Sequence, residues 1–214
     1  MNNLELKKQI IDTCLWLQDK NLVRGTWGNV SMRVNDTIVM TPTKIPYHIL
    51  TPEDMVTIDY EGNIIEGFRI PTSERELHRL LYLARPDVNC VIHFHPVFAS
   101  AMCATGEGIP PIFEEMTQLL GGEIPTTPEY IRSGEHVALA QAAVKCIRQK
   151  NAVLLRNHAP VCVGRDLEET KISCLVVEKA ATCYIALKNK FDVKVIPNEA
   201  VALEHHRFLF EYGT

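Results

Sequence analysis

Apolar positions along the chain follow two spacings, one typical of helices and one typical of strands. In residues 3–20 the apolar side chains recur three and four positions apart, with lysines and aspartates between them, which predicts an amphipathic helix. Ser73 with Glu76 and Asp166 with Glu169 have the spacing of capping boxes, so helices are expected to begin there. The predicted helices cover residues 3–20, 97–104, 135–149 and 167–188, and two more begin near residues 73 and 198.

Short β-branched and apolar runs lie between these helices, several of them bounded by glycine, proline or asparagine. No internal repeat or linker-like stretch divides the chain, so residues 1–214 are expected to form a single domain. Strands interleaved with long helices predict a layered α/β domain in which helices cover a central sheet. The predicted strands are residues 30–34, 37–41, 55–60, 63–66, 88–95, 152–156, 161–164 and 193–196.

Composition narrows the class of protein. The 214 residues are 46% hydrophobic and 22% charged, which supports a buried core and excludes disordered, collagen-like and small disulfide-rich chains. The net charge of −4 offers no basic field, so neither nucleic acid nor membrane is expected as a partner. The seven cysteines are scattered without a Cys-x-x-Cys pair and are expected to be reduced thiols. No signal peptide or membrane-spanning run is recognisable, and a soluble, cytoplasmic protein is expected.

Histidines at alternate positions of one apolar run are candidate metal ligands. His93 and His95 flank Phe94, and side chains two apart on a strand point to the same face, so both imidazoles project together. Glu74 at the start of a helix and His158 in the turn after a strand are two further candidates. Three imidazoles and a carboxylate suit Zn²⁺ or another divalent transition metal, although buried histidines and first-turn acids are also common without metal. The remaining histidines are interpreted as surface or packing residues: His48, His78, His136, His205 and His206.

Glycine and hydroxyl residues form a second candidate site. The segment Gly25-Thr26-Trp27-Gly28-Asn29-Val30-Ser31 combines neutral hydrogen-bond donors with glycines, which let the backbone approach an anion closely. Thr41-Pro42-Thr43 and Thr72-Ser73 add hydroxyls, the second pair at a helix N-terminus, where phosphate binding is favoured. Because a Gly-x-x-Gly segment entering a strand is usually just a turn, this assignment needs support from the rest of the sequence.

That support comes from a resemblance. The segments are similar, in their order along nearly the whole chain, to the class II aldolase/adducin family, and within it to the bacterial L-fuculose-1-phosphate aldolases. The resemblance implies an α/β layered domain with a central, mainly antiparallel sheet flanked by helices, and a homotetramer with active sites at subunit interfaces. The similar segments are Gln9–Cys14, Gly25–Ser31, Thr41–Thr43 with Ile45–Tyr47, Pro71–Glu74, His93–His95, Gly121-Gly122, Glu135–Ala140 and Leu154–His158.

The resemblance also assigns roles to residues. It implies that His93, His95 and His158 hold zinc, and that Glu74 contacts the metal in the empty site and exchanges a proton once substrate displaces it. The implied reaction cleaves a ketose 1-phosphate, L-fuculose 1-phosphate or a related deoxyketose 1-phosphate, to dihydroxyacetone phosphate and a small aldehyde. The resemblance implies that the substrate phosphate is held by Thr26, Gly28, Asn29, Thr43, Thr72 and Ser73.

Some positions depart from the family's pattern. The tyrosine that handles the proton on the C4 oxygen of the substrate has no counterpart, and Glu114 or Glu115 stands there, depending on where a one-residue gap is placed. Lys44 replaces a glycine and is expected to point to solvent, and Ala159 replaces the glycine after the last metal histidine. Tyr212 resembles a tail tyrosine that closes over substrate, or belongs to a frayed terminal helix.

Two other kinds of function stay open. A methylthioribulose-1-phosphate dehydratase or a pentulose-5-phosphate 4-epimerase would use the same metal site, and a glutamate in place of the tyrosine favours the dehydratase. A non-catalytic scaffold like the adducin head domain would keep the fold without the metal, but it has no use for four convergent ligands. Release of dihydroxyacetone phosphate would separate an aldolase from the dehydratase and the epimerase.

Overall fold

The computed structural model describes residues 3–132 and 134–211. Within these residues the centre of the protein is a seven-stranded sheet in the order β4-β3-β2-β1-β5-β7-β6, and each neighbouring pair of strands is antiparallel. The predicted fold class, a mainly antiparallel sheet flanked by helices, is confirmed. The strands are β1 (Asn29–Val34), β2 (Thr37–Met40), β3 (Val56–Ile58), β4 (Ile64–Glu66), β5 (Cys90–His93), β6 (Ala152–Leu154) and β7 (Pro160–Gly164).

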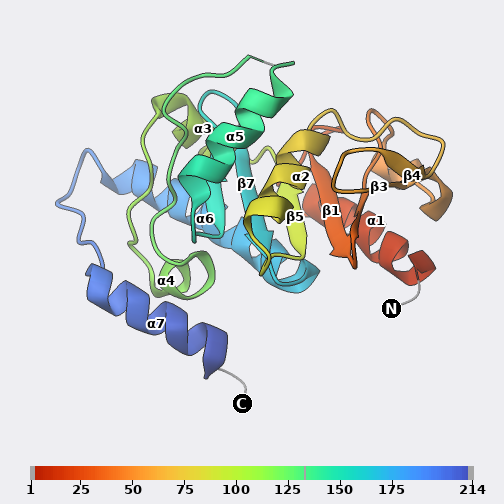
Figure 1. Ribbon diagram of the computed structural model, residues 1–214. Helices are drawn as coiled ribbons and strands as arrows, with labels where there is room; N and C mark the ends of the chain where they lie inside the picture. Colours follow the sequence, from red (N-terminus) through yellow and green to blue (C-terminus); the bar gives the residue numbers. More distant parts are fainter. Residues whose placement is uncertain (1–2, 133, 212–214) are drawn as a thin grey trace.

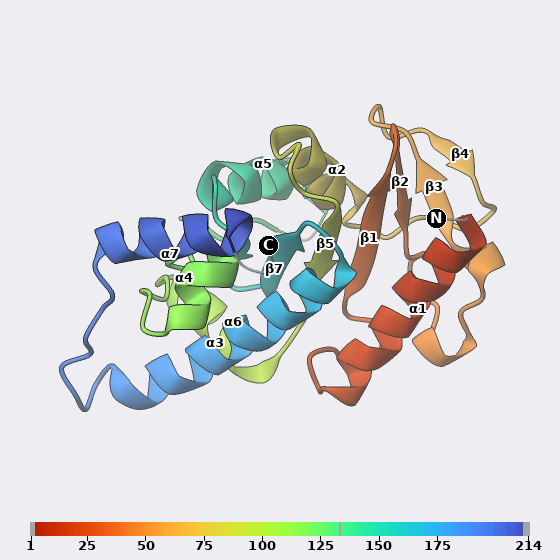
Figure 2. The same ribbon diagram turned by 90° about the horizontal axis from the view of Figure 1, so that it is seen from below.

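Helices cover both faces of this sheet (Figure 1). On one face lie α1 (Asn3–Asp19), α3 (Val97–Thr105) and α6 (Leu167–Leu187), and Figure 2 shows α1 and α6 in front of the strands. On the other face α2 (Arg75–Ala84) packs against α5 (His136–Ile147). Two further helices, α4 (Glu114–Leu120) and α7 (Asn198–Phe210), pack against each other, and α4 also contacts α6.

Alternation along the strands divides the buried side chains between two hydrophobic clusters. Cys90, Ile92 and Phe94 contribute to the cluster under α1, α3 and α6, whereas Val91 contributes to the cluster under α2 and α5. Side chains two apart on a strand share a face, so His93 is on the same face as Val91, toward α2 and α5. This alternation decides which face of the sheet carries the candidate ligands.

Most predicted elements are present, and the differences have physical causes. Residues 193–196 are all described but form no strand, and the amide of Ile196 donates to the carbonyl oxygen of Pro111. A β-branched run forms a strand only when a neighbouring strand accepts and donates backbone hydrogen bonds along it. The Ser73–Glu76 capping box is wrong, because the N-cap is Glu74 and Glu76 pairs with Arg79 instead. The sequence pattern also gave no sign of α4, which has only seven residues and is stabilised by packing on α6 and α7.

Other expectations concern the thiols and the membrane. All seven cysteines are free, and five of them are buried, as expected for reduced core residues. None of the helices in the described part of the chain combines the length and the apolar character needed to cross a bilayer.

Candidate active site

The three histidines predicted as ligands lie close together. His93 and His95 come from the C-terminal end of β5 and the residues that follow it, and His158 comes from the turn between β6 and β7. His93 is the last residue of β5, and His95 follows after the chain has left the sheet. His93 Nε2 lies 2.9 Å from His95 Nε2, and one nitrogen from each of the three rings, His158 included, lies within 4.8 Å of the others. Phe94 is buried in the opposite cluster, which confirms that His93 and His95 share a face.

Glu74 lies against this histidine cluster. It is the N-cap of α2 and its side chain forms no cap hydrogen bond, so the carboxylate is free to reach across the pocket. Glu74 Oε2 lies 3.2 Å from His93 Nε2, and Glu74 Oε1 lies 3.4 Å from His158 Nε2. The positive end of the α2 dipole faces this carboxylate.

The donor set fits a divalent transition metal. Ligand atoms about 2.1 Å from a tetrahedral Zn²⁺ lie about 3.4 Å from one another, which is the scale of the separations found here. His93 Nδ1 lies 3.0 Å from the carbonyl oxygen of Pro160, an acceptor that fixes the proton on Nδ1 and leaves the Nε2 lone pair facing His95. Burial, followed by the charges of His93 and His158, lowers the pKa of His95 to about 3, and burial lowers the pKa of His93 well below 6.5. Both rings are therefore neutral at physiological pH, the form that binds metal.

The predicted phosphate residues line the same pocket as the metal residues. This cavity has a volume of about 540 Å³, within the usual range for small-ligand sites. Its two ends are called here the metal end and the phosphate end. The metal end is the part lined by the predicted ligands Glu74, His93, His95 and His158. The phosphate end is the part lined by the predicted phosphate residues Thr26, Gly28, Asn29, Thr43, Thr72 and Ser73, with Lys44 beside them.

Two positions at the phosphate end have backbone requirements. A Cβ on Gly28 would lie 2.7 Å from Val23 Cγ2 and 3.1 Å from the carbonyl oxygen of His93, so only glycine lets this segment approach β5. Lys44 has φ of 60°, in the left-handed region that glycine adopts readily, which explains why the family's pattern has glycine there. Lys44 is exposed, as expected, but it also lines the pocket, so its ammonium group is available to an anion.

Several pocket residues were not identified from the sequence. His136 was interpreted as a surface or packing residue, yet it lines the cavity from the first turn of α5. The ordered similarity included the segment Glu135–Ala140, so a signal was present, but nothing in the pattern of that helix pointed to a pocket. The other unpredicted lining residues with functional side chains are Trp27, Tyr130 and Asn157.

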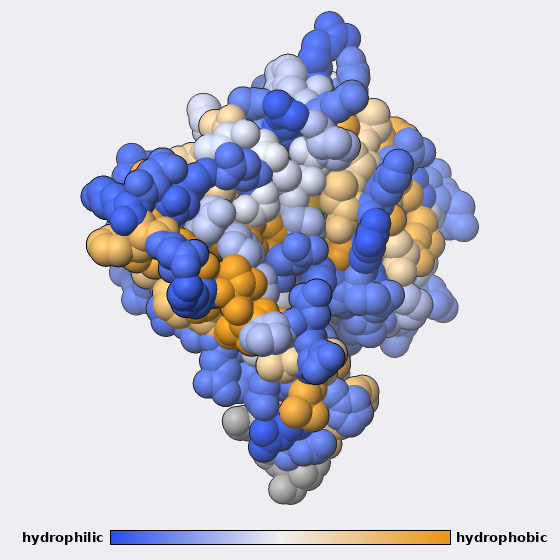
Figure 3. Space-filling view, turned by 90° about the vertical axis from the view of Figure 1, so that its left-hand side faces the viewer, coloured by the Kyte–Doolittle hydropathy of each residue, from blue (hydrophilic) through white to orange (hydrophobic). Residues whose placement is uncertain are grey.

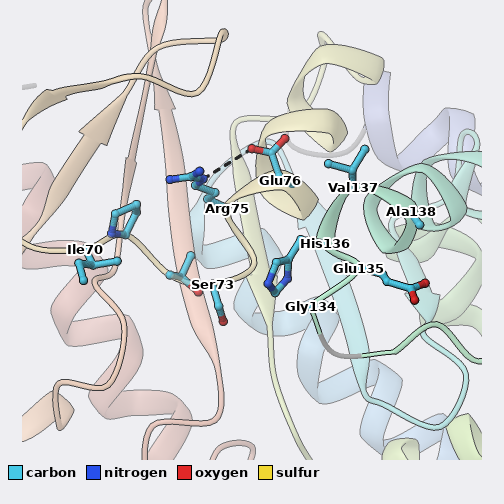
Figure 4. Close-up of a pocket in the computed structure, with 11 residues that line it drawn as sticks. Ile70, Ser73, Arg75, Glu76, Gly134, Glu135, His136, Val137 and Ala138 are labelled. Carbon is cyan, nitrogen blue, oxygen red and sulfur yellow. Dashed lines mark ion pairs between the residues drawn. The ribbon is translucent and has the colours of Figure 1, made fainter.

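A second cavity of about 520 Å³ adjoins the phosphate end between the N-termini of α2 and α5 (Figure 4). Ser73 and His136 line both cavities, and Figure 4 shows them facing one another across the opening. Arg75 turns toward Glu76, with Nε 3.6 Å from Oε1, so part of its charge is compensated. The pocket therefore continues past Ser73 into the second cavity.

Glu114 and Glu115, the candidates for the missing tyrosine, lie elsewhere. In the described residues of this single chain neither of them lines the pocket. Both are in the first turn of α4, and Glu115 forms an ion pair with Lys179 on α6. Burial acts to raise the pKa of Glu115, but the hydrogen bond and charge of Lys179 together with a backbone hydrogen bond lower this pKa overall. Tyr212 is outside the described residues.

Comparison with known proteins agrees with this geometry. The family model described as Class II Aldolase and Adducin N-terminal domain matches residues 8–185. L-fuculose phosphate aldolase of Escherichia coli (strain K12) is 36% identical over 214 residues, covering 97% of this chain and 96% of that protein. A 5-methylthioribulose-1-phosphate/5-deoxyribulose-1-phosphate aldolase of Escherichia coli O45:K1 (strain S88 / ExPEC) is 33% identical, covering 86% and 85%. A solved structure of an L-fuculose 1-phosphate aldolase superimposes with a TM-score of 0.91 at 29% identity, covering 96% of this chain and 97% of that one.

A layered sheet with a histidine–glutamate pocket at its strand ends and these similarities define one class. The chain belongs to the class II aldolase and adducin family. Within the family it is a class II aldolase, an enzyme of the lyase class, and the scaffold alternative is set aside.

Proposed function

We propose that this enzyme is a zinc-dependent aldolase that cleaves a ketose 1-phosphate, L-fuculose 1-phosphate or a related deoxyketose 1-phosphate, to dihydroxyacetone phosphate and a small aldehyde. One observation carries the proposal: three imidazoles and a carboxylate line one part of a cavity that is also lined by glycine, hydroxyl and amide groups. A substrate with two oxygens for a metal and a phosphate further along its chain matches both ends at once.

The residues divide the reaction between them. A divalent ion held by His93, His95 and His158 supplies Lewis-acid stabilisation for the negative charge that develops on the C2 oxygen as the C3–C4 bond breaks. In its protonated form Glu74 would give its proton to C3 to release dihydroxyacetone phosphate, and as the carboxylate it would take the same proton back in the synthetic direction. The groups at the phosphate end fix the substrate's orientation, because contacts remote from the reacting bond hold the reacting carbons in line with the catalytic groups.

The substrate class follows the names of the relatives. Two aldolases of similar length to this chain are named for L-fuculose phosphate and for 5-methylthioribulose-1-phosphate/5-deoxyribulose-1-phosphate. Both names describe phosphorylated sugars, and the second name specifies 1-phosphates. The cavity of about 540 Å³ has room for a sugar phosphate of this size.

The proposal includes a homotetramer with active sites at subunit interfaces. Because Glu114 and Glu115 lie outside the pocket of a single chain, either can handle the proton on the C4 oxygen only from a neighbouring subunit. Figure 3 shows hydrophobic patches among hydrophilic surface on the side of the molecule where α4, α6 and α7 lie. Exposed apolar side chains on α6, on α7 and between them include Ile185, Phe191, Val195, Leu203 and Phe210, a set suited to burial against another subunit.

A coupled assay for dihydroxyacetone phosphate tests the reaction. The purified protein is given L-fuculose 1-phosphate and 5-deoxyribulose 1-phosphate before chelation, after chelation and after zinc is restored. Release that is lost on chelation and recovered with zinc supports the aldolase and ranks the two substrates. No release from metal-loaded protein contradicts it, and the protein is then given methylthioribulose 1-phosphate and a pentulose 5-phosphate, with dehydration and epimerisation as the readouts.

A further inference from the structure

A line of buried polar side chains extends from Glu74 into the protein between β1 and α2. Asn29 Nδ2 donates to Glu74 Oε2 at 2.9 Å, and Asn29 Oδ1 lies 2.5 Å from His78 Nε2. Beyond the ring, Ser31 Oγ lies 2.6 Å from His78 Nδ1 and 2.8 Å from the hydroxyl oxygen of Tyr82. All five residues are buried. His78, which was interpreted from the sequence as a surface or packing residue, is fully buried. We call these side chains the Glu74–Tyr82 relay.

The relay follows from a match between strand and helix spacing. Asn29 and Ser31 are two residues apart on β1, so they share a face and lie about 6.6 Å apart along the strand. Glu74, His78 and Tyr82 are four apart on α2, so they share a stripe with steps of about 6 Å. The two repeats are nearly equal, and the side chains therefore interleave in sequence from the site inward. An accidental contact would not repeat along both elements.

Hydrogen-bond chemistry gives the relay one direction. An ionised carboxylate only accepts, so the amide nitrogen of Asn29 must face Glu74 and its carbonyl oxygen must face His78. His78 then carries its proton on Nε2 and donates it to Asn29, which leaves Nδ1 to accept from the hydroxyl of Ser31. Tyr82 donates to Ser31, either to its hydroxyl or to its carbonyl oxygen 2.9 Å away. From Ser31 through His78 to Asn29, every donor points toward the carboxylate.

We propose that His78 is a positioning residue that acts through Asn29 to fix the orientation of the Glu74 carboxylate in the active site. The inference rests on the proposed role of Glu74 in proton exchange. Glu74 approaches two imidazoles and one amide, and when substrate displaces it from the metal end the amide of Asn29 is the contact that remains. Asn29 also lines the pocket, so the side chain that His78 holds borders the space in which substrate would bind.

Variants of His78 test this role through the separation of kcat from KM. His78→Leu removes both ring nitrogens, and kcat is expected to fall about 10- to 100-fold with little change in KM or in zinc content, as when a ligand's supporting partner is lost. His78→Gln places an amide donor close to the former Nε2 and is expected to recover most of kcat. Leu81→Ala is the matched control, since Leu81 is fully buried on the same helix without a place in the relay. It should lower thermal stability while the folded enzyme keeps its kcat.

Several outcomes would overturn the proposal. A folded, zinc-loaded His78→Leu enzyme with wild-type kcat would do so, as would a His78→Gln enzyme no better than His78→Leu, or a Leu81→Ala enzyme with the same loss of kcat. If His78→Leu does not fold, Ser31→Ala takes its place; it leaves Nδ1 without its donor and should give a smaller loss of kcat at unchanged KM, whereas an unchanged kcat would count against the relay.

A second readout does not depend on activity. Nitrogen-15 NMR of the histidine rings in the wild-type protein should show His78 with its proton on Nε2 and a bare Nδ1 at neutral pH. The opposite tautomer would overturn the proposal whatever the kinetics. If wild-type protein releases no dihydroxyacetone phosphate but His78 has the expected tautomer, the proposed function fails and the hydrogen-bond direction of the relay stands.

Discussion

The two ends of the active-site pocket differ in how their residues are held in place. At the metal end, the side chains stand at the ends of regular elements, and His93 and Glu74 are buried and held by neighbours on several sides. At the phosphate end, the groups come mainly from turns, Ser73 and Lys44 are exposed, and the space continues into a second cavity. One end is fixed by packing and the other by backbone conformation.

The difference suits the role proposed for each end. Charge that develops during bond cleavage is stabilised only by groups already in place, so displacement of a ligand by a fraction of an ångström is costly. A phosphate group spreads its charge over several oxygens and accepts bonds from any donor in reach, which makes a turn an adequate binding element. Changes at the metal end should therefore act on kcat, and changes at the phosphate end should act on KM.

The largest effect is expected from loss of a metal ligand. His95→Ala should lower kcat/KM at least about 10³-fold, since several kcal/mol of Lewis-acid stabilisation depend on the ion. Inductively coupled plasma mass spectrometry should show that the variant no longer retains zinc through dialysis, and chelation should produce the same loss in wild-type protein. A His95→Ala enzyme that lost activity but kept its metal would contradict the assignment of His95 to the metal end, because the ring would then act as something other than a ligand.

Acid should destabilise the metal-free protein through the metal end. The pKa of His95 is lowered to about 3 by burial and neighbouring imidazoles, so between that value and 6.5 the unfolded chain binds more protons than the folded one. Stability is therefore complete above about pH 6.5 and falls as the pH drops, at up to about 1.4 kcal/mol per unit for this one ring. Urea denaturation at pH 6.5 and 4.5 should show a loss about 2 kcal/mol smaller in metal-free His95→Gln than in metal-free wild type.

The pH window separates this contribution from that of the carboxylates. Asp54 also has a shifted pKa: burial acts to raise it, but bonds from Thr51 and Arg69 lower it overall. A lowered carboxyl pKa contributes stability that is lost only below the ordinary value of 3.8, so it acts below the range measured. Equal losses in wild type and His95→Gln between pH 6.5 and 4.5 would show that the His95 ring is not held in its neutral form.

Gly28 lies where the two ends meet, and its substitution should affect both. In Gly28→Ala the new Cβ meets Val23 and the backbone oxygen of His93, and overpacking of this kind costs about 1–3 kcal/mol. Gly25→Ala is the control, because a Cβ there meets nothing within 4 Å and only the positive φ of 58° is penalised. Denaturant titration with KM and zinc content should show the Gly28 variant less stable than the Gly25 variant and impaired in both properties. Intact zinc binding in Gly28→Ala would mean that the two ends are independent.

The same contrast explains what the sequence revealed about the fold and the site. Alternation and helical spacing located the central strands and the long helices, and the i, i+2 rule placed His93 and His95 on one face. Position in the expected elements suggested Glu74 and His158, residue type suggested the phosphate residues, and the resemblance assigned their roles; all of them line one cavity. Local patterns could not place Tyr130 or His136 in that cavity, because both arrive through packing of the segment before α5 and of α5 on α2.

The relay between Glu74 and Tyr82 shows a signal that was present but easy to miss. A period of two on β1 and a period of four on α2 both carry polar residues into the interior, yet each pattern by itself describes an ordinary amphipathic element. Only knowledge that β1 lies against α2 turns the two patterns into one line of hydrogen bonds. The positions of Glu114 and Glu115 illustrate the opposite limit, since a role there depends on a second subunit.

The smallest effect is expected from Lys44, at the exposed rim of the phosphate end. Lys44→Gly should stabilise the protein by up to about 1 kcal/mol, because glycine adopts a φ of 60° without strain. The same change removes a cation from the pocket, and KM for the phosphate substrate should rise about threefold to tenfold with kcat unchanged, as for loss of about 1 kcal/mol of partly screened attraction. Lys44→Gln separates the two effects, since it keeps the backbone strain and removes only the charge. A Lys44→Gln enzyme with unchanged KM would show that the ammonium group points to solvent and that the phosphate end depends on neutral donors alone.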